Sequence, residues 1–334
     1  MKKQRHDGRP RIVVVLGQTA TGKSDLAVEI ACRFGGEVVS ADSRQVYRGL
    51  DIGAGKITTR EMRGVPHHLL NVADPKGRRY TAEDFRRDAA RAIDGIIARG
   101  KVPIVCGGTG FYIDALLSSG SFPAVPPDQR LRARLARRST AALMRELRRL
   151  DPRRARDIDP HNKVRIIRAI EIARALGKVP PLEKIRAKDA KYETLFIGLT
   201  ADRPAIRARI RARLLKRMKG DKMIREVARL HKKGVSWKRL HEFGLEYRHI
   251  ADHIRNKTPR ERTLARLGQD IFDFSKRQMR WFKRNPAITW FSPRETRRVL
   301  QQVQSFLRPR LSSRLRGPGR TRRTSRNSAP AKRR

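Results

Sequence analysis

Short apolar runs alternate with amphipathic segments along the first part of the chain. Residues 12–16 are a continuous apolar run, and residues 102–105 form a second one. Runs of this length are typical of strands that are buried on both faces of a parallel sheet. Between them, residues 25–34 space their apolar side chains like one face of a helix. This alternation of strands and helices predicts an α/β fold built on a parallel sheet.

The pattern changes twice further along the chain. Between residues 123 and 181, helical periodicity carries many basic residues, and prolines stand at both ends, which predicts a helical insertion. From residue 308 onward, Arg, Ser, Pro and Gly dominate without any acid, and such a segment cannot bury enough surface to fold. The chain therefore divides into the first part of the α/β core (1–122), a helical insertion (123–181), a mostly helical completion of the core (182–307) and a disordered basic tail (308–334).

A phosphate-binding loop is predicted directly after the first apolar run. The sequence from Gly17 to Ser24 reads Gly-Gln-Thr-Ala-Thr-Gly-Lys-Ser and fits the pattern G-x-x-x-x-G-K-[ST]. In such a loop the backbone N–H groups point at phosphate oxygens, Lys23 adds a positive charge, and Ser24 can ligate a phosphate-bound Mg²⁺. A chance glycine-rich turn is the alternative, and the predicted strand and helix on either side argue against it. The loop residues expected at the phosphate are Gly17, Thr19, Ala20, Thr21, Gly22, Lys23 and Ser24.

Two further predicted strands end beside this loop. Asp42 follows a short apolar segment, and at the carboxyl edge of a parallel sheet it can act as a general base toward an N–H or O–H group. An ordinary helix N-cap is the alternative. The second apolar run ends in Cys106 and a glycine-rich turn, whereas ATP-hydrolysing proteins with this loop usually carry a carboxylate there. The absence of a carboxylate after this strand favours a function other than ATP hydrolysis for the phosphate site. Residues 195–202 also end near an acid, which could hold the metal instead.

The charge of the chain points to a polyanionic partner. It has 80 Lys and Arg against 32 Asp and Glu in 334 residues, a formal net charge of +48. Phosphate neutralisation by such a protein makes binding steeply salt-dependent. A lineage-wide bias toward arginine is the alternative cause of the excess.

Cysteine usage and hydropathy bear on localisation. Cys32 and Cys106 are the two cysteines, and both are expected in buried elements, so neither a disulfide framework nor a metal cluster is predicted. The sequence has no apolar run of about 18 residues that could span a membrane, and the basic N-terminus lacks the apolar stretch of a signal peptide. We expect a cytoplasmic monomer with no membrane association and no obligate protein partner.

Ordered motifs identify the chain as similar to a known family. The motifs GQTATGKS, SADSRQVYRGLDIG, GVPHHLL and CGGTGFYIDAL, in this order, resemble the tRNA dimethylallyltransferase family of bacterial type. The likeness continues through residues 162–176, 244–248 and 277–282 and covers about residues 12–292. It implies a P-loop NTPase-like core that transfers a dimethylallyl group to N6 of the adenosine at position 37, adjacent to the anticodon of tRNAs, with release of diphosphate. The implied partners are dimethylallyl diphosphate, Mg²⁺ and the anticodon stem-loop of tRNA.

The resemblance also implies residue roles. Asp42 matches the base that takes the N6 proton, and Thr109 matches a position close to the reacting adenosine. Arg213 joins the loop residues in binding the diphosphate, and Ser24 is the implied Mg²⁺ ligand. The implied tRNA-binding residues are Asp42, Ser43, Arg44, Gln45, Thr109, Val164, Arg165, Ile166, Ile167 and Arg168. Arg165 and Arg168 are three residues apart and share a helix face, for which a solvated charged face is the alternative.

Departures from the family pattern and other functions stay open at this point. Gln18 stands where the family usually has proline, and no Cys/His cluster of the eukaryotic zinc finger follows residue 292. The roles of His67, His68 and residues 277–282 are unassigned. One alternative is a small-molecule kinase in which Asp42 activates a hydroxyl toward ATP, and another is an RNA-binding protein with a relic loop. A branch of the family that prenylates free adenine nucleotides is a third, which the long insertion disfavours.

Overall fold

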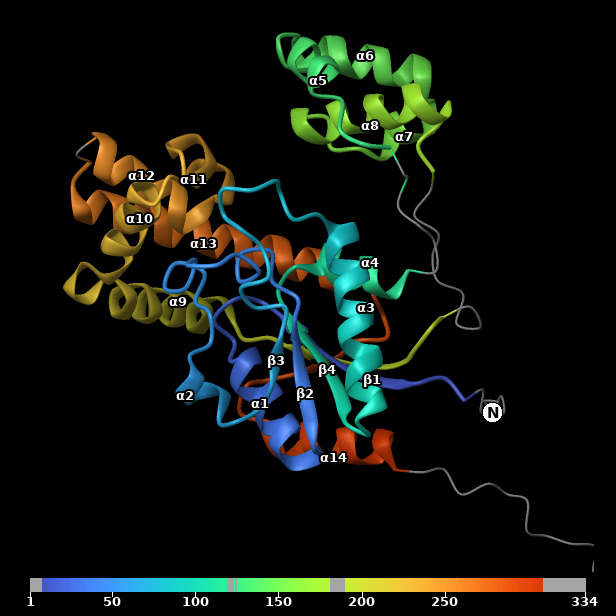
Figure 1. The fold of residues 1–334 in the computed structure, drawn as a ribbon, viewed down its shortest axis with the longest axis vertical. Helices are drawn as coiled ribbons and strands as arrows, with labels where there is room; N and C mark the ends of the chain where they lie inside the picture. Colours follow the sequence, from blue (N-terminus) through green and yellow to red (C-terminus); the bar gives the residue numbers. More distant parts are fainter. Residues whose placement is uncertain (1–7, 119–122, 124, 181–189, 257, 309–334) are drawn as a thin grey trace, which may run out of the picture.

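A six-stranded sheet forms the centre of the computed structural model, which describes residues 8–118, 123, 125–180, 190–256 and 258–308. Its strands are β1 (Arg11–Gly17), β2 (Gly36–Ser40), β3 (His67–His68), β4 (Val102–Gly107), β5 (Glu193–Leu199) and β6 (Thr289–Phe291). They pair in the order β3-β2-β4-β1-β5-β6, and every pair is parallel (Figure 1). The predicted α/β fold with a parallel sheet is therefore confirmed.

The central strand β1 explains why the sequence reads as an uninterrupted apolar run. Alternate side chains point to opposite faces of a strand. Ile12, Val14 and Leu16 pack in the core on one face, and Val13 and Val15 pack in the core on the other. The first face is covered by α3 (Ala82–Ala98) and α4 (Gly110–Leu117), and the second by α1 (Lys23–Phe34) and α14 (Thr296–Leu307). Because both faces are buried, neither set of positions can be polar.

The last third of the chain adds a helical layer above the carboxyl ends of the strands (Figure 1). Its helices are α9 (Arg203–Met218), α10 (Lys222–Lys232), α11 (Trp237–Phe243), α12 (Leu245–Asn256) and α13 (Arg260–Phe282). They share a core with Val46, Tyr47 and Leu50, which belong to the segment that follows β2. The short helix α2 (Thr59–Met62) lies further along that segment. Residues far apart in the sequence are thus brought to one edge of the sheet.

The insertion between β4 and β5 is a separate group of helices in Figure 1. It consists of α5 (Gln129–Ala136), α6 (Thr140–Leu150), α7 (Pro152–Asp157) and α8 (Lys163–Leu176). These helices have a core of their own, built around Leu135, Leu143, Leu147, Ile166 and Ile170. Across the described residues, no helix is long and apolar enough to cross a membrane. The tail expected to be disordered lies outside the described residues beyond Arg308.

The structure places the unassigned histidines and corrects one local expectation. His67 and His68 form the edge strand β3, where His68 Nε2 lies 2.7 Å from Glu37 Oε2 and His67 Nδ1 lies 2.8 Å from the carbonyl oxygen of Val65. Cys32 is exposed, because it lies on the outer side of α1, while Cys106 is buried as expected. Strand β6 was not predicted, because three residues are too few to give a periodic pattern.

Candidate active site

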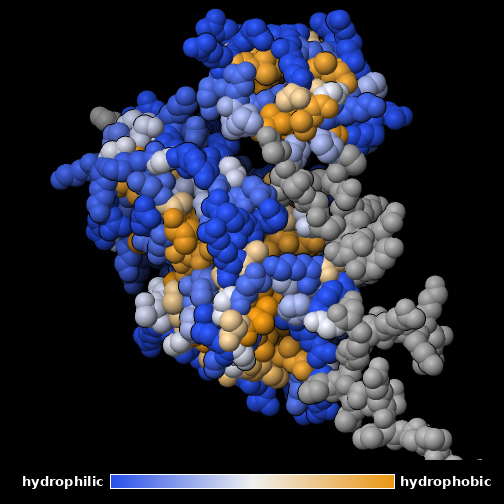
Figure 2. Space-filling model, turned by 45° about the vertical axis from the view of Figure 1, so that its right-hand side comes forward, coloured by the Kyte–Doolittle hydropathy of each residue, from blue (hydrophilic) through white to orange (hydrophobic). Residues whose placement is uncertain are grey.

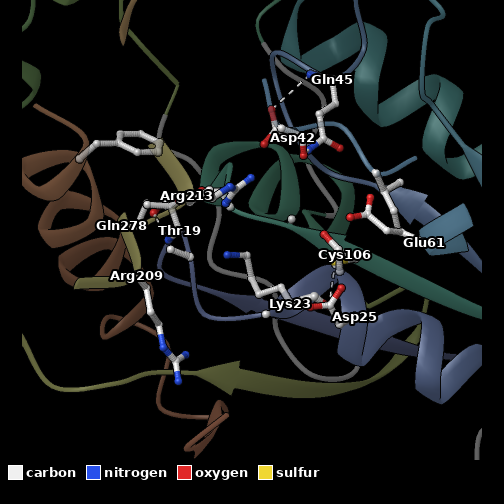
Figure 3. Close-up of a pocket in the computed structure, with 18 residues that line it drawn as sticks. Thr19, Lys23, Asp25, Asp42, Gln45, Glu61, Cys106, Arg209, Arg213 and Gln278 are labelled. Atoms are coloured by element: carbon white, nitrogen blue, oxygen red, sulfur yellow. Dashed lines mark hydrogen bonds between the residues drawn. The ribbon is translucent and has the colours of Figure 1, made fainter. Parts of the chain in front are cut away.

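The loop between β1 and α1 borders a cavity of about 420 Å³ at the carboxyl ends of the strands (Figure 3). Gly17 has a φ of 134°, and a Cβ atom there would lie 2.2 Å from the carbonyl oxygen of Leu199. Both the conformation and the lack of space therefore require glycine. Ala20 also has a positive φ, 63°, which is uncommon for alanine and is found in strained functional loops. The loop residues that line the cavity are Thr19, Ala20, Gly22, Lys23 and Ser24.

Other predicted loop residues lie behind this lining. Gly17 packs against β5, and Thr21 is buried and donates its hydroxyl to the carbonyl of Gln18 at 2.8 Å. Lys23 Nζ donates to the same carbonyl. These contacts fold the loop back on itself, so that Thr21 shapes the loop in this structure and does not border the cavity.

Lys23 is a half-buried ammonium group at the start of α1 that points into the cavity (Figure 3). The pKa of Lys23 is lowered to about 8, mainly by burial; the positive charge of Arg213 contributes to the lowering, while Cys106 and Asp42 act in the opposite direction. Desolvation disfavours the charged form of a lysine in this way. A bound anion would restore the charge, so the site is suited to a phosphate group.

Asp42 follows β2 and lines the same cavity. Its Oδ1 accepts the N–H groups of Arg44 at 2.8 Å and Gln45 at 3.3 Å, which fixes the turn, although no helix begins there. From the residues that the structure describes, Oδ2 accepts no hydrogen bond, so this oxygen is available to a proton donor in the cavity. Thr109 Oγ1 accepts the N–H of Ser43 at 3.1 Å and thereby holds the turn to the end of β4.

The turn after Asp42 places its remaining side chains differently. Gln45 lines the cavity, and its Nε2 donates to the carbonyl of Gly55 at 3.3 Å. Arg44 Nη1 donates to Ser43 Oγ at 3.0 Å, outside the lining of the cavity. Arg44 and Ser43 thus do not line the cavity in this structure.

Helices α9 and α13 complete the cavity with residues from the last third of the chain. Arg213 and Arg209 come from α9, and Phe274 and Gln278 come from α13. The amide of Gln278 accepts the N–H of Thr19 at 2.8 Å and donates to the carbonyl of Gly108 at 2.9 Å. Gln278 therefore ties the phosphate-binding loop to the turn after β4. The resemblance to the family included residues 277–282 and so drew attention to Gln278, but its contacts with Thr19 and Gly108 were not predictable from the sequence.

The carboxylates and the thiol at the cavity bear on metal binding. The carboxylates of Asp25 and Glu61 and the hydroxyl of Ser24 border the cavity, beside the thiol of Cys106. Burial raises the pKa of Cys106 to about 12, so its thiol stays protonated and is not a metal ligand. Across the described ranges, no group of three or more His, Cys, Asp or Glu is arranged to hold a metal ion. The donor set fits an Mg²⁺ held mainly by phosphate oxygens, with the hydroxyl of Ser24 as a protein ligand.

The insertion presents only part of its predicted RNA-binding segment. Val164 is 71% exposed and Arg165 is exposed at the start of α8, whereas Ile166 and Ile167 are buried in the core of the insertion. Arg168 is half-buried, pairs with Glu171 and donates to the carbonyl of Val125 at 2.8 Å. The side chains of Ile166 and Ile167 pack inward in this structure, and RNA binding by residues 164–168 stays a prediction. In the view of Figure 2 the surface is mostly hydrophilic, with hydrophobic patches both on the upper part of the molecule and on the body below it.

Comparisons with known proteins agree on one family. The model of the IPP transferase family matches residues 45–285. A tRNA dimethylallyltransferase of Treponema denticola is 43% identical over 274 residues, which are 81% of this chain and 91% of that protein. A tRNA dimethylallyltransferase of Thermomicrobium roseum is 39% identical over 288 residues, which are 85% of this chain and 86% of that protein.

Solved structures share the fold. The tRNA isopentenylpyrophosphate transferase of Bacillus halodurans superimposes with a TM-score of 0.67 at 31% identity, covering 89% of this chain and 96% of that one. A eukaryotic dimethylallyltransferase acting on tRNA superimposes with a TM-score of 0.76 at 23% identity, over 91% of this chain and 82% of that one. The second likeness is evidence for the fold alone.

Proposed function

Because this chain belongs to the tRNA dimethylallyltransferase family, of bacterial type, we propose that it transfers a dimethylallyl group from dimethylallyl diphosphate to N6 of the adenosine at position 37 of tRNA. The observation that carries this proposal is that a phosphate-binding loop and the carboxylate of Asp42 border one cavity. One group can hold the leaving diphosphate while the other accepts a proton from the attacking amine.

The proposed step balances without a further reactant. The bond between the allylic carbon and the diphosphate oxygen breaks, the bond between that carbon and N6 forms, and the N6 proton goes to Asp42. Lys23, Arg213 and the N–H groups of the loop stabilise the negative charge on the departing oxygens. A bound Mg²⁺, held by Ser24 and the diphosphate, would supply further charge neutralisation at the leaving group. The cytoplasmic, monomeric state remains a prediction from sequence.

A transfer assay tests the proposed function. The protein is incubated with Mg²⁺, labelled dimethylallyl diphosphate and either tRNA, AMP or ATP. We expect label in tRNA at the adenosine next to the anticodon and none in the free nucleotides. Label in AMP or ATP instead would move the protein to the branch that prenylates free nucleotides, and hydrolysis of ATP without prenyl transfer would favour a kinase.

The lowered pKa of Lys23 predicts a pH profile. In the free protein the ammonium group is charged below about pH 8 and neutral above it. The kcat/KM for dimethylallyl diphosphate, which reports groups of the free enzyme, is therefore expected to fall as the pH rises through about 8. Lys23→Arg keeps its charge over this range and should remove the fall, whatever its effect on the absolute rate. A fall that persists in Lys23→Arg would assign the titration to another group.

Arg165 is the element of the insertion best placed to bind RNA, because its side chain is exposed and α8 is ordered. Arg165→Ala is expected to raise the KM for tRNA about tenfold, the equivalent of about 1.4 kcal/mol. The matched control is Arg148→Ala, which removes the same charge from the exposed side of α6. Kinetics with a substrate tRNA and a non-substrate tRNA check the prediction. Equal effects of the two variants would mean that only overall charge matters.

A further inference from the structure

Glu226 is a buried carboxylate on α10 that binds a row of backbone amides. Its side chain accepts the N–H groups of Asp51 at 3.2 Å, Ile52 at 2.6 Å and Gly53 at 3.0 Å, and the residue is 2% exposed. Hydrogen bonds to an ionised acceptor are stronger than those between neutral groups. Glu226 therefore fixes the loop after β2 to a helix that lies more than 170 positions later in the chain.

Tyr247 on α12 extends this contact by one residue. Its hydroxyl donates to Glu226 Oε1 at 2.9 Å and accepts the N–H of Ala54 at 3.1 Å. A Cβ atom on Gly53 would lie 2.7 Å from the ring of Tyr247, so the loop is pressed against the aromatic side chain. Two side chains from late helices thus bind four successive N–H groups, those of residues 51–54.

The residue that follows the fixed segment, Gly55, lines the active-site cavity. A Cβ atom on Gly55 would lie 2.1 Å from Nη2 of Arg213 and 1.5 Å from Nη2 of Arg217, so both guanidinium groups pack directly on it. Arg217 Nη1 also donates to the carbonyl of Gly53 at 3.3 Å. The carbonyl of Gly55 accepts the side chain of Gln45. The position of this short segment therefore sets where Arg213 and Gln45 lie in the cavity.

We propose that Glu226 is a positioning residue for prenyl transfer, which holds residues 51–55 so that Arg213 is aimed at the diphosphate. The inference rests on the proposed function, because that function assigns the binding site of dimethylallyl diphosphate to this cavity. Glutamine cannot replace glutamate here. Its NH₂ group would face the backbone N–H donors, and the negative charge that binds them would be lost. By holding residues 51–55, Glu226 determines how tightly dimethylallyl diphosphate is bound, although its side chain is remote from the reacting atoms.

The test compares Glu226→Gln with the wild type in steady-state transfer and in calorimetric binding of inorganic pyrophosphate. We expect the KM for dimethylallyl diphosphate to rise about tenfold and pyrophosphate affinity to fall by a similar factor, with the KM for tRNA changed less than twofold. Hydrogen exchange at the amides of residues 51–53 should accelerate. Tyr247→Phe removes one donor and keeps the ring, so we expect smaller changes in the same direction.

The matched control is Asp151→Asn in the insertion. Asp151 is also a buried carboxylate that accepts two backbone N–H groups, those of Arg154 and Val179, each at 2.9 Å. Its variant should lower the melting temperature without changing the KM for dimethylallyl diphosphate. If Glu226→Gln behaves in the same way, Glu226 has only a structural role and the inference is wrong. If the wild type transfers nothing to tRNA, the proposed function fails, and pyrophosphate binding still decides the role of Glu226.

Discussion

Replacing Asp42 with alanine is expected to slow transfer to tRNA by about 10²–10⁴-fold, the usual loss when a positioned general base is removed. Binding of tRNA and of dimethylallyl diphosphate should change little, because the loop, Lys23 and Arg213 remain. The expectation follows from the two carboxylate oxygens of Asp42, which lines the cavity: Oδ1 is occupied by the N–H groups of Arg44 and Gln45, whereas Oδ2 accepts no hydrogen bond from the described residues. Single-turnover rates at saturating substrates measure the chemical step.

Asp42→Asn separates the two roles of this side chain. An asparagine oxygen can still accept the N–H groups of Arg44 and Gln45, so the turn is kept, but the amide cannot take a proton. If Asp42 is the base, both variants are equally slow. If Asp42→Asn transfers at the wild-type rate while Asp42→Ala does not, Asp42 only anchors the turn, and another group must accept the proton from N6.

Lys23→Ala and Arg213→Ala are each expected to weaken binding of dimethylallyl diphosphate and to slow transfer by about 10²–10³-fold. This is the range for losing one preorganised donor to developing charge. Both side chains border the cavity, and the charge of Arg213 lowers the pKa of Lys23, which indicates that the two act on the same region. Titration with inorganic pyrophosphate and single-turnover kinetics give the two effects separately.

Arg211→Ala serves as the control for this pair. Arg211 lies on α9 like Arg213, but its side chain is exposed and does not line the cavity. It should bind pyrophosphate like the wild type, which would show that position, and not the overall positive charge, is decisive. A loss of affinity as large as that of Arg213→Ala would contradict the assignment. Tight ATP binding with turnover, abolished by Lys23→Ala, would support the kinase alternative.

Local patterns were sufficient to predict the central strands of the sheet, the phosphate-binding loop and Asp42. The apolar run of β1 is buried on both faces, and the phosphate-binding loop has a fixed spacing, so each can be read within about ten neighbouring residues. Asp42 was predictable because parallel strands end at one edge of the sheet. None of these inferences requires knowledge of how distant segments pack.

The contacts that complete the site were not predictable from the sequence, because they join segments that lie far apart along the chain. Gln278 and Glu226 bind backbone groups 259 and 173 residues away, and hydrophobic periodicity specifies which face of a helix is buried without specifying its partner. The continuous segment of α8 that we predict to bind RNA is not exposed throughout, because each residue of a helix is rotated by about 100° from the last. Arg165 therefore faces solvent, while Ile166 and Ile167 face the core.

The bridge made by Gln278 has a consequence for biosynthesis. The residue of the phosphate-binding loop that Gln278 contacts is synthesised 259 residues before Gln278, and strand β6 follows later still. Contacts of such long sequence separation form late, because a large loop must close first. A nascent or truncated chain that ends before α13 holds the loop, Asp42 and the arginines of α9 without Phe274 and Gln278. We therefore expect a chain that terminates before α13 to transfer the prenyl group poorly, because the phosphate-binding loop lacks its anchor to the turn after β4.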